Sequence, residues 1–73
     1  MIKTLTAILE REGDGFVALC PELDIASQGT TLEAAKVNLR EAVELFFECA
    51  DGKEVAGRLS GEIYVTQLEV EFA

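Results

Sequence analysis

Residues 17–31 read VALCPELDIASQGTT, and this stretch decides the predicted fold because it holds a strand end, a second strand and a helix start. The apolar run into Cys20 indicates a strand, and Pro21 ends it because proline has no backbone N–H to donate. Residues 23–28 alternate between apolar and other side chains, which predicts a further short strand. Gly29 marks its exit.

A helix is predicted over residues 32–50. Thr30 stands three residues before Glu33, which is the spacing of a capping box, and Thr31 is the neighbouring candidate for the N-cap. Asp51-Gly52 ends the helix, because glycine commonly follows a helix C-terminus. Apolar side chains recur along it at the helical period and form one wide stripe: Leu32, Ala35, Leu39, Ala42, Val43, Phe46, Cys49 and Ala50. A helix with such a stripe is expected to cover a sheet face.

Two strands are predicted before Pro21. Residues 2–11 are rich in aliphatic and β-branched side chains and run into the turn signal EGDG. Asp14-Gly15 is interpreted as the hairpin turn, and residues 16–20 as the returning strand. Both faces of residues 2–11 are partly apolar, which suits a central strand or a sheet with an oligomer contact on its outer face.

Beyond the helix, residues 53–61 are polar with two glycines and are interpreted as a loop. Residues 62–72 alternate and are predicted to form a last strand. The expected architecture is therefore a single α+β domain over residues 1–73, in the order β-β-β-α-β. It has an antiparallel three-stranded sheet, a C-terminal strand and one helix on one sheet face.

The size and composition favour self-association. The chain has 73 residues, of which 49% are apolar, so it can fold as one small domain but sits near the lower size limit for a stable core. Cys20 and Cys49 are far apart and are expected to be buried free thiols in a reducing cytoplasm. Without disulfide or metal support, a dimer or larger homo-oligomer is expected.

The charge balance bears on the class of partner. There are 14 acidic and 6 basic residues, and the formal net charge is −8. This argues against direct nucleic-acid binding, which needs clustered lysine and arginine, and it permits a basic protein partner. The plain alternative is that the acidity only confers solubility. No apolar run approaches the roughly 20 residues of a membrane span, so a cytoplasmic protein without membrane contact is expected.

The residue types offer little for catalysis. The chain has no histidine, which removes Ser-His and Cys-His pairs and most transition-metal sites. Cys20 has no basic neighbour to lower its pKa. A β-β-β-α-β order is also that of ribonuclease H, in which strand carboxylates hold magnesium, and Glu10 within the first predicted strand keeps a metal-dependent nuclease open as a third hypothesis. No cofactor or metal is expected under the leading interpretation.

Several short motifs, in their order and spacing over residues 5–48, resemble the HicB-like antitoxin family. They are Gly15-Phe16, Cys20-Pro21-Glu22-Leu23, Ser27-Gln28-Gly29-Thr30-Thr31, Glu33-Ala34, Asn38 and Glu41-Ala42. The resemblance implies a partial ribonuclease H-like fold without catalytic acids. It also implies a non-enzymatic role in a type II toxin-antitoxin system, in which the protein covers a HicA toxin, a small basic ribonuclease that cleaves mRNA.

The leading hypothesis is an antitoxin-like protein that binds and neutralises a basic HicA-type ribonuclease. Many members of the family add a C-terminal DNA-binding domain, and this chain is expected to act without one. The acidic side chains chosen from charge as partner-binding candidates are Glu12, Asp14, Glu22 and Asp24. The alternative is a standalone homo-oligomeric protein-binding module with no active toxin partner.

Overall fold

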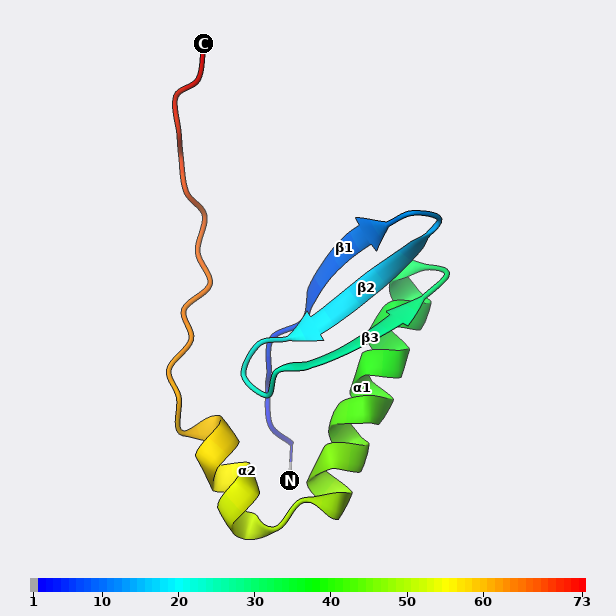
Figure 1. The fold of residues 1–73 in the computed structure, drawn as a ribbon, viewed down its shortest axis with the longest axis vertical. Coiled ribbons are helices and arrows are strands. Elements are labelled where there is room, and N and C mark those ends of the chain that lie inside the picture. The colour runs from blue at the N-terminus through cyan, green and yellow to red at the C-terminus, as the bar shows by residue number, and fades with distance from the viewer. Residues whose placement is uncertain (1) are drawn as a thin grey trace.

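The computed structural model describes residues 2–73 and shows a small antiparallel sheet with one long helix across it (Figure 1). Its elements are β1 (Ile8–Glu12), β2 (Gly15–Cys20), β3 (Ile25–Gly29), α1 (Leu32–Cys49) and α2 (Gly52–Leu59). The strands lie in the order β1-β2-β3, and both pairs are antiparallel. The α+β class and the three-stranded antiparallel sheet followed by a helix are therefore confirmed.

The β1–β2 hairpin turns one residue earlier than predicted. Glu12 pairs with Gly15, which leaves Gly13 and Asp14 as the two turn residues. Gly13 has a φ of 58°, a left-handed conformation that glycine adopts without steric cost. Gly15 is instead the first residue of β2, where an added Cβ would lie 2.9 Å from the carbonyl oxygen of Gly29.

Strand β1 is shorter than the predicted residues 2–11 because β2 ends at Cys20 and offers nothing further to pair with. Ile8 lies opposite Leu19, and the chain then turns away through Pro21. Residues 2–7 therefore continue beyond the sheet without a strand beside them. In the same turn Asp24 has a φ of 54°, so β3 begins at Ile25 rather than at the predicted residue 23.

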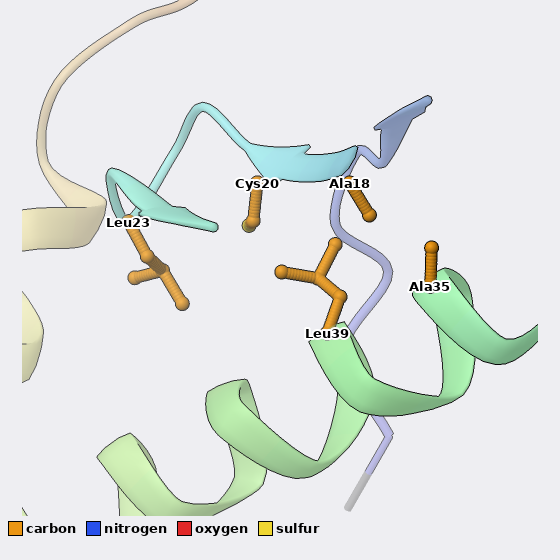
Figure 2. Packing of buried hydrophobic residues seen from close by; sticks show 5 residues of the cluster. All are labelled: Ala18, Cys20, Leu23, Ala35 and Leu39. Atoms are coloured by element: carbon orange, nitrogen blue, oxygen red, sulfur yellow. The ribbon is translucent and has the colours of Figure 1, made fainter. Parts of the chain in front are cut away.

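The core is the contact between α1 and the inner face of the sheet. Its five buried side chains are Ala18, Cys20, Leu23, Ala35 and Leu39 (Figure 2). Ala18 and Cys20 are two residues apart in β2, so both side chains point toward the helix. Ala35 and Leu39 are four residues apart, which is about one turn of α1. Partly buried leucine, isoleucine, valine and phenylalanine side chains extend this core toward α2 and the N-terminal residues.

Gly29 allows α1 to start almost against β3. An added Cβ there would lie 2.5 Å from the backbone nitrogen of Ala35. The Asn38 side chain donates to the backbone oxygen of Gln28 at 2.7 Å, which ties the second turn of the helix to the strand. Thr31, not Thr30, is the N-cap, and its hydroxyl accepts from the backbone N–H of Ala34 at 3.0 Å.

The chain after α1 differs from the prediction in two ways. The expected loop over residues 53–61 is largely helix α2, whose N-cap Asp51 accepts from the backbone N–H of Glu54 at 2.8 Å. The expected strand over residues 62–72 is extended but has no strand beside it among residues 2–73, so it forms no part of that sheet. Figure 1 shows it running away from the folded body.

We predict that Gly29→Ala lowers the free energy of unfolding by about 1–3 kcal/mol, because the new methyl group meets helix backbone atoms that cannot move aside independently. The matched control is Gly57→Ala in α2, where an added Cβ has no neighbour within 4 Å. Alanine favours a helix interior by up to about 1 kcal/mol over glycine, so the control should be neutral or stabilising. Urea unfolding measures both, and equal stability of the two variants would contradict the close packing at Gly29.

Candidate protein-binding surfaces

The face of the sheet opposite α1 carries apolar side chains at its centre. Val17 and Leu19 lie on this face because they alternate along β2 with Ala18 and Cys20, which point into the core. Ile8 lies on the same face because it pairs with Leu19. Ile8 is 38% exposed, and Val17 and Leu19 are partly exposed. No described helix covers these side chains, since α1 lies on the other face (Figure 1).

Carboxylates border this apolar centre on the β1 side. Glu10 pairs with Val17, and Glu12 pairs with Gly15, so both side chains share the face of Ile8. Both are exposed, as is Asp14 in the adjoining turn. We call the set Ile8, Glu10, Glu12, Asp14, Val17 and Leu19 the outer sheet surface. An apolar centre with a charged rim is the usual anatomy of a protein-binding surface.

The four acidic residues predicted to bind a partner lie at opposite ends of β2. Glu12 and Asp14 precede this six-residue strand, whereas Glu22 and Asp24 follow it. At about 3.3 Å per residue, the two pairs are roughly 20 Å apart. Glu22 and Asp24 both lie in the turn between β2 and β3.

Glu22 is engaged in a contact within the protein. Its carboxylate accepts from the backbone N–H of Thr6 at 3.0 Å and from the Thr6 hydroxyl at 2.6 Å. Burial, the largest single contribution, raises the pKa of Glu22, but the hydrogen bonds from the Thr6 side chain and from backbone N–H groups together lower it. This contact holds the N-terminal residues against the turn, a role that charge alone did not reveal.

The two thiols differ in environment. Burial raises the pKa of Cys20, and the nearby Glu22 carboxylate adds to this effect while accepting from the thiol at 3.6 Å. A buried, protonated thiol is a poor nucleophile, as expected for a core residue. Cys49 was expected to be buried as well, but it is exposed near the end of α1.

An open groove of about 880 Å³ lies beside the core. Its walls come from residues 2–7, from α1 and from α2, and its apolar lining includes Leu5, Val43, Phe47, Val55 and Leu59. We call it the N-terminal groove. Sequence patterns did not indicate it, because it joins three segments that are far apart in the chain.

The position of α2, and with it one wall of this groove, is fixed by Arg58. Its guanidinium donates to the backbone oxygen of Leu23 and lies 5.2 Å from the ring centroid of Phe46. It also lies 3.8 Å from the carboxylate of Glu54, one turn earlier in α2. These contacts attach a short helix to both the β2–β3 turn and the main helix.

The third hypothesis placed a metal site at Glu10. Among residues 2–73, no group of three or more histidine, cysteine or acidic side chains has the geometry to hold a metal ion. Glu10 lies with Glu12 on the outer sheet surface. Within the same residues, neither helix is both long and apolar enough to cross a membrane.

A protein of Helicobacter pylori strain J99, described as a UPF0150 protein, is 30% identical over 70 residues, which cover 94% of this chain and 97% of the relative. The chain belongs to the UPF0150 family. Two UPF0150 proteins of Synechocystis are 46% and 47% identical over 46 and 49 residues, covering 60% and 64% of the chain and 64% and 62% of the relatives. No protein-family model matches the chain, and no solved structure matches it significantly.

We predict that Glu22→Gln destabilises this UPF0150 domain by about 1 kcal/mol at neutral pH, because a charged acceptor of two hydrogen bonds becomes neutral. The folded-state pKa of Glu22 is lowered from about 4.5, so the stability it contributes is present above that value and is lost as the pH falls through the folded pKa. Urea unfolding across pH 3–7 should therefore show the variant and the wild type converging at the acid end.

Glu12→Gln is the matched control, since it removes the same charge from an exposed strand position. It should change the free energy of unfolding by less than Glu22→Gln at neutral pH. Equal effects of the two substitutions would show that the hydrogen bonds from Thr6 to Glu22 add nothing to the free energy of unfolding.

We predict that Cys49 reacts rapidly with a thiol reagent at pH 8 in the native protein, while Cys20 reacts only when the protein unfolds. Cys20 is 1% exposed and its pKa is raised, which removes both access and thiolate. Absorbance should report one fast thiol and a second only in denaturant. Cys49→Ser should abolish the fast phase, and a fast phase that survives this substitution would contradict the burial of Cys20.

Proposed function

We propose that this UPF0150 protein is a HicB-like antitoxin domain that binds and neutralises a basic HicA-type ribonuclease in the cytoplasm. The observation that carries the proposal is the outer sheet surface, where a partly exposed apolar centre at Ile8, Val17 and Leu19 adjoins carboxylates at Glu10 and Glu12. Such a surface fits a partner with an apolar patch bordered by lysine or arginine.

The overall charge supports a basic partner. With a formal net charge of −8, the domain produces a negative field that attracts a basic protein and speeds the encounter. The same field repels RNA phosphates, so the proposed protein acts by covering the ribonuclease and does not itself contact nucleic acid or use a cofactor. A basic ribonuclease needs cationic side chains at its RNA-binding surface, and these are the groups that an acidic cover would meet.

The resemblance to HicB-like antitoxins gives further support. The motifs that carry it fall at structurally defined positions: Gly15-Phe16 opens β2, Pro21 ends that strand, and Gly29 packs against α1. The three-stranded antiparallel sheet with one long helix on its inner face is also compatible with the expected partial ribonuclease H-like fold.

The four acidic candidates take different parts in this proposal. Glu12 and Asp14 belong to the outer sheet surface and are assigned to direct contact with the toxin. Asp24 is exposed at the far end of the same sheet, where it can meet a partner that spans the length of β2. Glu22 contributes its charge to the field, while its Oε2 accepts from Thr6 and its Oε1 accepts from the Cys20 thiol.

A second candidate function is a homo-oligomeric protein-binding module without an active toxin partner. The observation that favours it is the exposed C-terminal segment over residues 62–73, which carries apolar side chains such as Tyr64, Leu68 and Phe72. Self-association through this segment would leave the outer sheet surface open, so homo-oligomerisation alone does not decide between the two candidates, whereas binding of a toxin does.

The proposal predicts that a small basic protein encoded beside this gene copurifies with the chain, and that co-expression removes its toxicity. The double substitution Glu10→Lys with Glu12→Lys should weaken this complex by roughly 100-fold or more, since it places cations against cations. Calorimetric titration at fixed salt measures the dissociation constant, and growth on co-expression measures neutralisation.

The matched control is Glu41→Lys with Glu48→Lys, which makes the same change in net charge at exposed positions on α1. It should weaken the complex much less, because only the long-range field changes. Equal weakening by both double variants would reject the outer sheet surface as the contact, and failure of the adjacent basic protein to bind would reject the antitoxin function.

A further inference from the structure

The C-terminal segment over residues 62–73 is extended, exposed and unpaired within the described chain. Tyr64 is 81% exposed, Leu68 85% and Phe72 93%. Its side-chain hydrogen bond, from the Tyr64 hydroxyl to the Glu62 carboxylate, stays within the segment. Large apolar side chains at this density are costly to leave in water and mark an interaction site.

The order of residues in this segment is that of a strand with two different faces. Tyr64, Leu68, Val70 and Phe72 fall on one side of an extended chain, with Thr66 between them. The other side has Ile63 and Val65 at its start and then Gln67, Glu69 and Glu71. Such a segment fits the edge of a sheet that has an apolar surface on one side of the new strand.

The β1 edge of the sheet is a matching acceptor. β1 pairs only with β2 among the described strands, so its other edge carries free backbone donors and acceptors. Residues 2–7 continue the same extended chain without a strand beside them. The stretch 2–12 and the segment 62–72 are equal in length at eleven residues.

The N-terminal groove lies beside this edge on the helix side. Residues 2–7 form one of its walls, and α1 contributes Val43 and Phe47 to the opposite one. A strand added next to residues 2–7 directs alternate side chains toward this groove. The apolar row of the segment, from Tyr64 to Phe72, therefore meets an apolar lining.

The charges of the two surfaces are also complementary. Lys3, Lys36 and Arg40 lie along the groove with one carboxylate, Glu44, so three of the protein's 6 basic residues border it. The segment carries no lysine or arginine; of its glutamates, Glu62 falls on the side of Tyr64, whereas Glu69 and Glu71 fall on the other side of the strand. The negative charge of the segment thus suits a groove bordered by more basic than acidic side chains, and this favours the C-terminal segment over an unrelated apolar peptide as the occupant.

We propose that residues 62–72 of one copy add as a strand to the free edge of residues 2–12 in a second copy and cover its N-terminal groove. Reciprocal exchange gives a two-fold dimer in which each groove is filled by the partner's segment, a common and inexpensive route to dimerisation. Main-chain hydrogen bonds supply affinity in such strand addition, and the alternate side chains supply specificity.

A second copy is the occupant because the segment projects away from its own body (Figure 1). Leu59 packs against the core and Arg58 holds α2 in place, so the segment starts from a fixed point with only Ser60 and Gly61 as a link. Two residues reach at most about 7 Å. The segment thus extends from that point as an arm.

The expected interface is also large enough for a stable dimer. Each segment carries two aromatic side chains, Tyr64 and Phe72, and an aromatic side chain buries about 150–250 Å². Two exchanged segments therefore bury about 600–1,000 Å² through aromatic side chains alone, before their aliphatic side chains and backbone are counted. Stable interfaces bury about 1,200–2,000 Å² in total.

The strand exchange is independent of the proposed antitoxin function, since it needs no toxin and leaves the outer sheet surface open. It is tested on the full chain alone by sedimentation over a range of concentrations. We expect a dimer, and we expect Leu68→Lys to raise its dissociation constant roughly 10- to 100-fold by placing a cation in the groove. Gln67→Lys is the matched control, because it introduces the same residue on the other side of the segment and should leave the dimer intact.

An isotope-filtered NMR experiment on a mixture of labelled and unlabelled chains distinguishes exchange from folding back. Contacts between the Tyr64 or Phe72 ring of one copy and the Leu5 or Val43 methyl groups of another are the expected result. The same contacts within one copy, or a monomer at millimolar concentration, would overturn the proposal. A dimer that Gln67→Lys and Leu68→Lys weaken equally would overturn it as well.

Discussion

The close approach of α1 to β3 is the constraint on which the rest of this structure depends. With no side chain at Gly29, the backbone of Ala34 and Ala35 can lie directly over the strand, and this sets where Leu39 enters the core. The small side chains of Ala18 and Ala35 keep the layers close, so a core of only five buried residues is continuous. The outer sheet surface is uncovered as a result, because the one long helix is committed to the other face.

Local signals in the sequence were sufficient for the central part of the fold. Pro21, Gly29 and the threonines before Leu32 determine the backbone conformation of the few residues next to them. The bounds of β2, β3 and α1 were therefore predicted to within about two residues. Helix α2 was missed because its polar, glycine-containing sequence has weak helical propensity, and its position depends on Arg58 and Leu59 contacting residues far away in the chain. Residues 62–72 were predicted as a strand because their apolar and polar side chains alternate. This pattern shows that the segment suits a sheet, but it does not show whether a partner strand is present.

The candidate surfaces show the same difference between features set by local sequence and features set by contacts far apart in the chain. Glu12, Asp14 and Asp24, which were chosen from charge, are exposed in the structure, because carboxylates at turns and strand ends are usually solvated. Charge did not distinguish Glu22, whose contact with Thr6 spans sixteen residues and arises only after the chain has folded. The N-terminal groove was equally invisible, since residues 2–7, α1 and α2 approach one another only through tertiary packing.

The anchoring of α2 has a consequence for how the protein responds to its own abundance. Because Arg58 ties this helix to the backbone of Leu23 and to Phe46, the exposed arm is presented in a defined direction rather than sampling the volume around a flexible tether. A pre-oriented arm loses less conformational entropy on association, so in the proposed strand exchange it lowers the concentration at which dimers form. In the proposed dimer, Arg58 thus couples the concentration of the protein to the number of outer sheet surfaces in each particle.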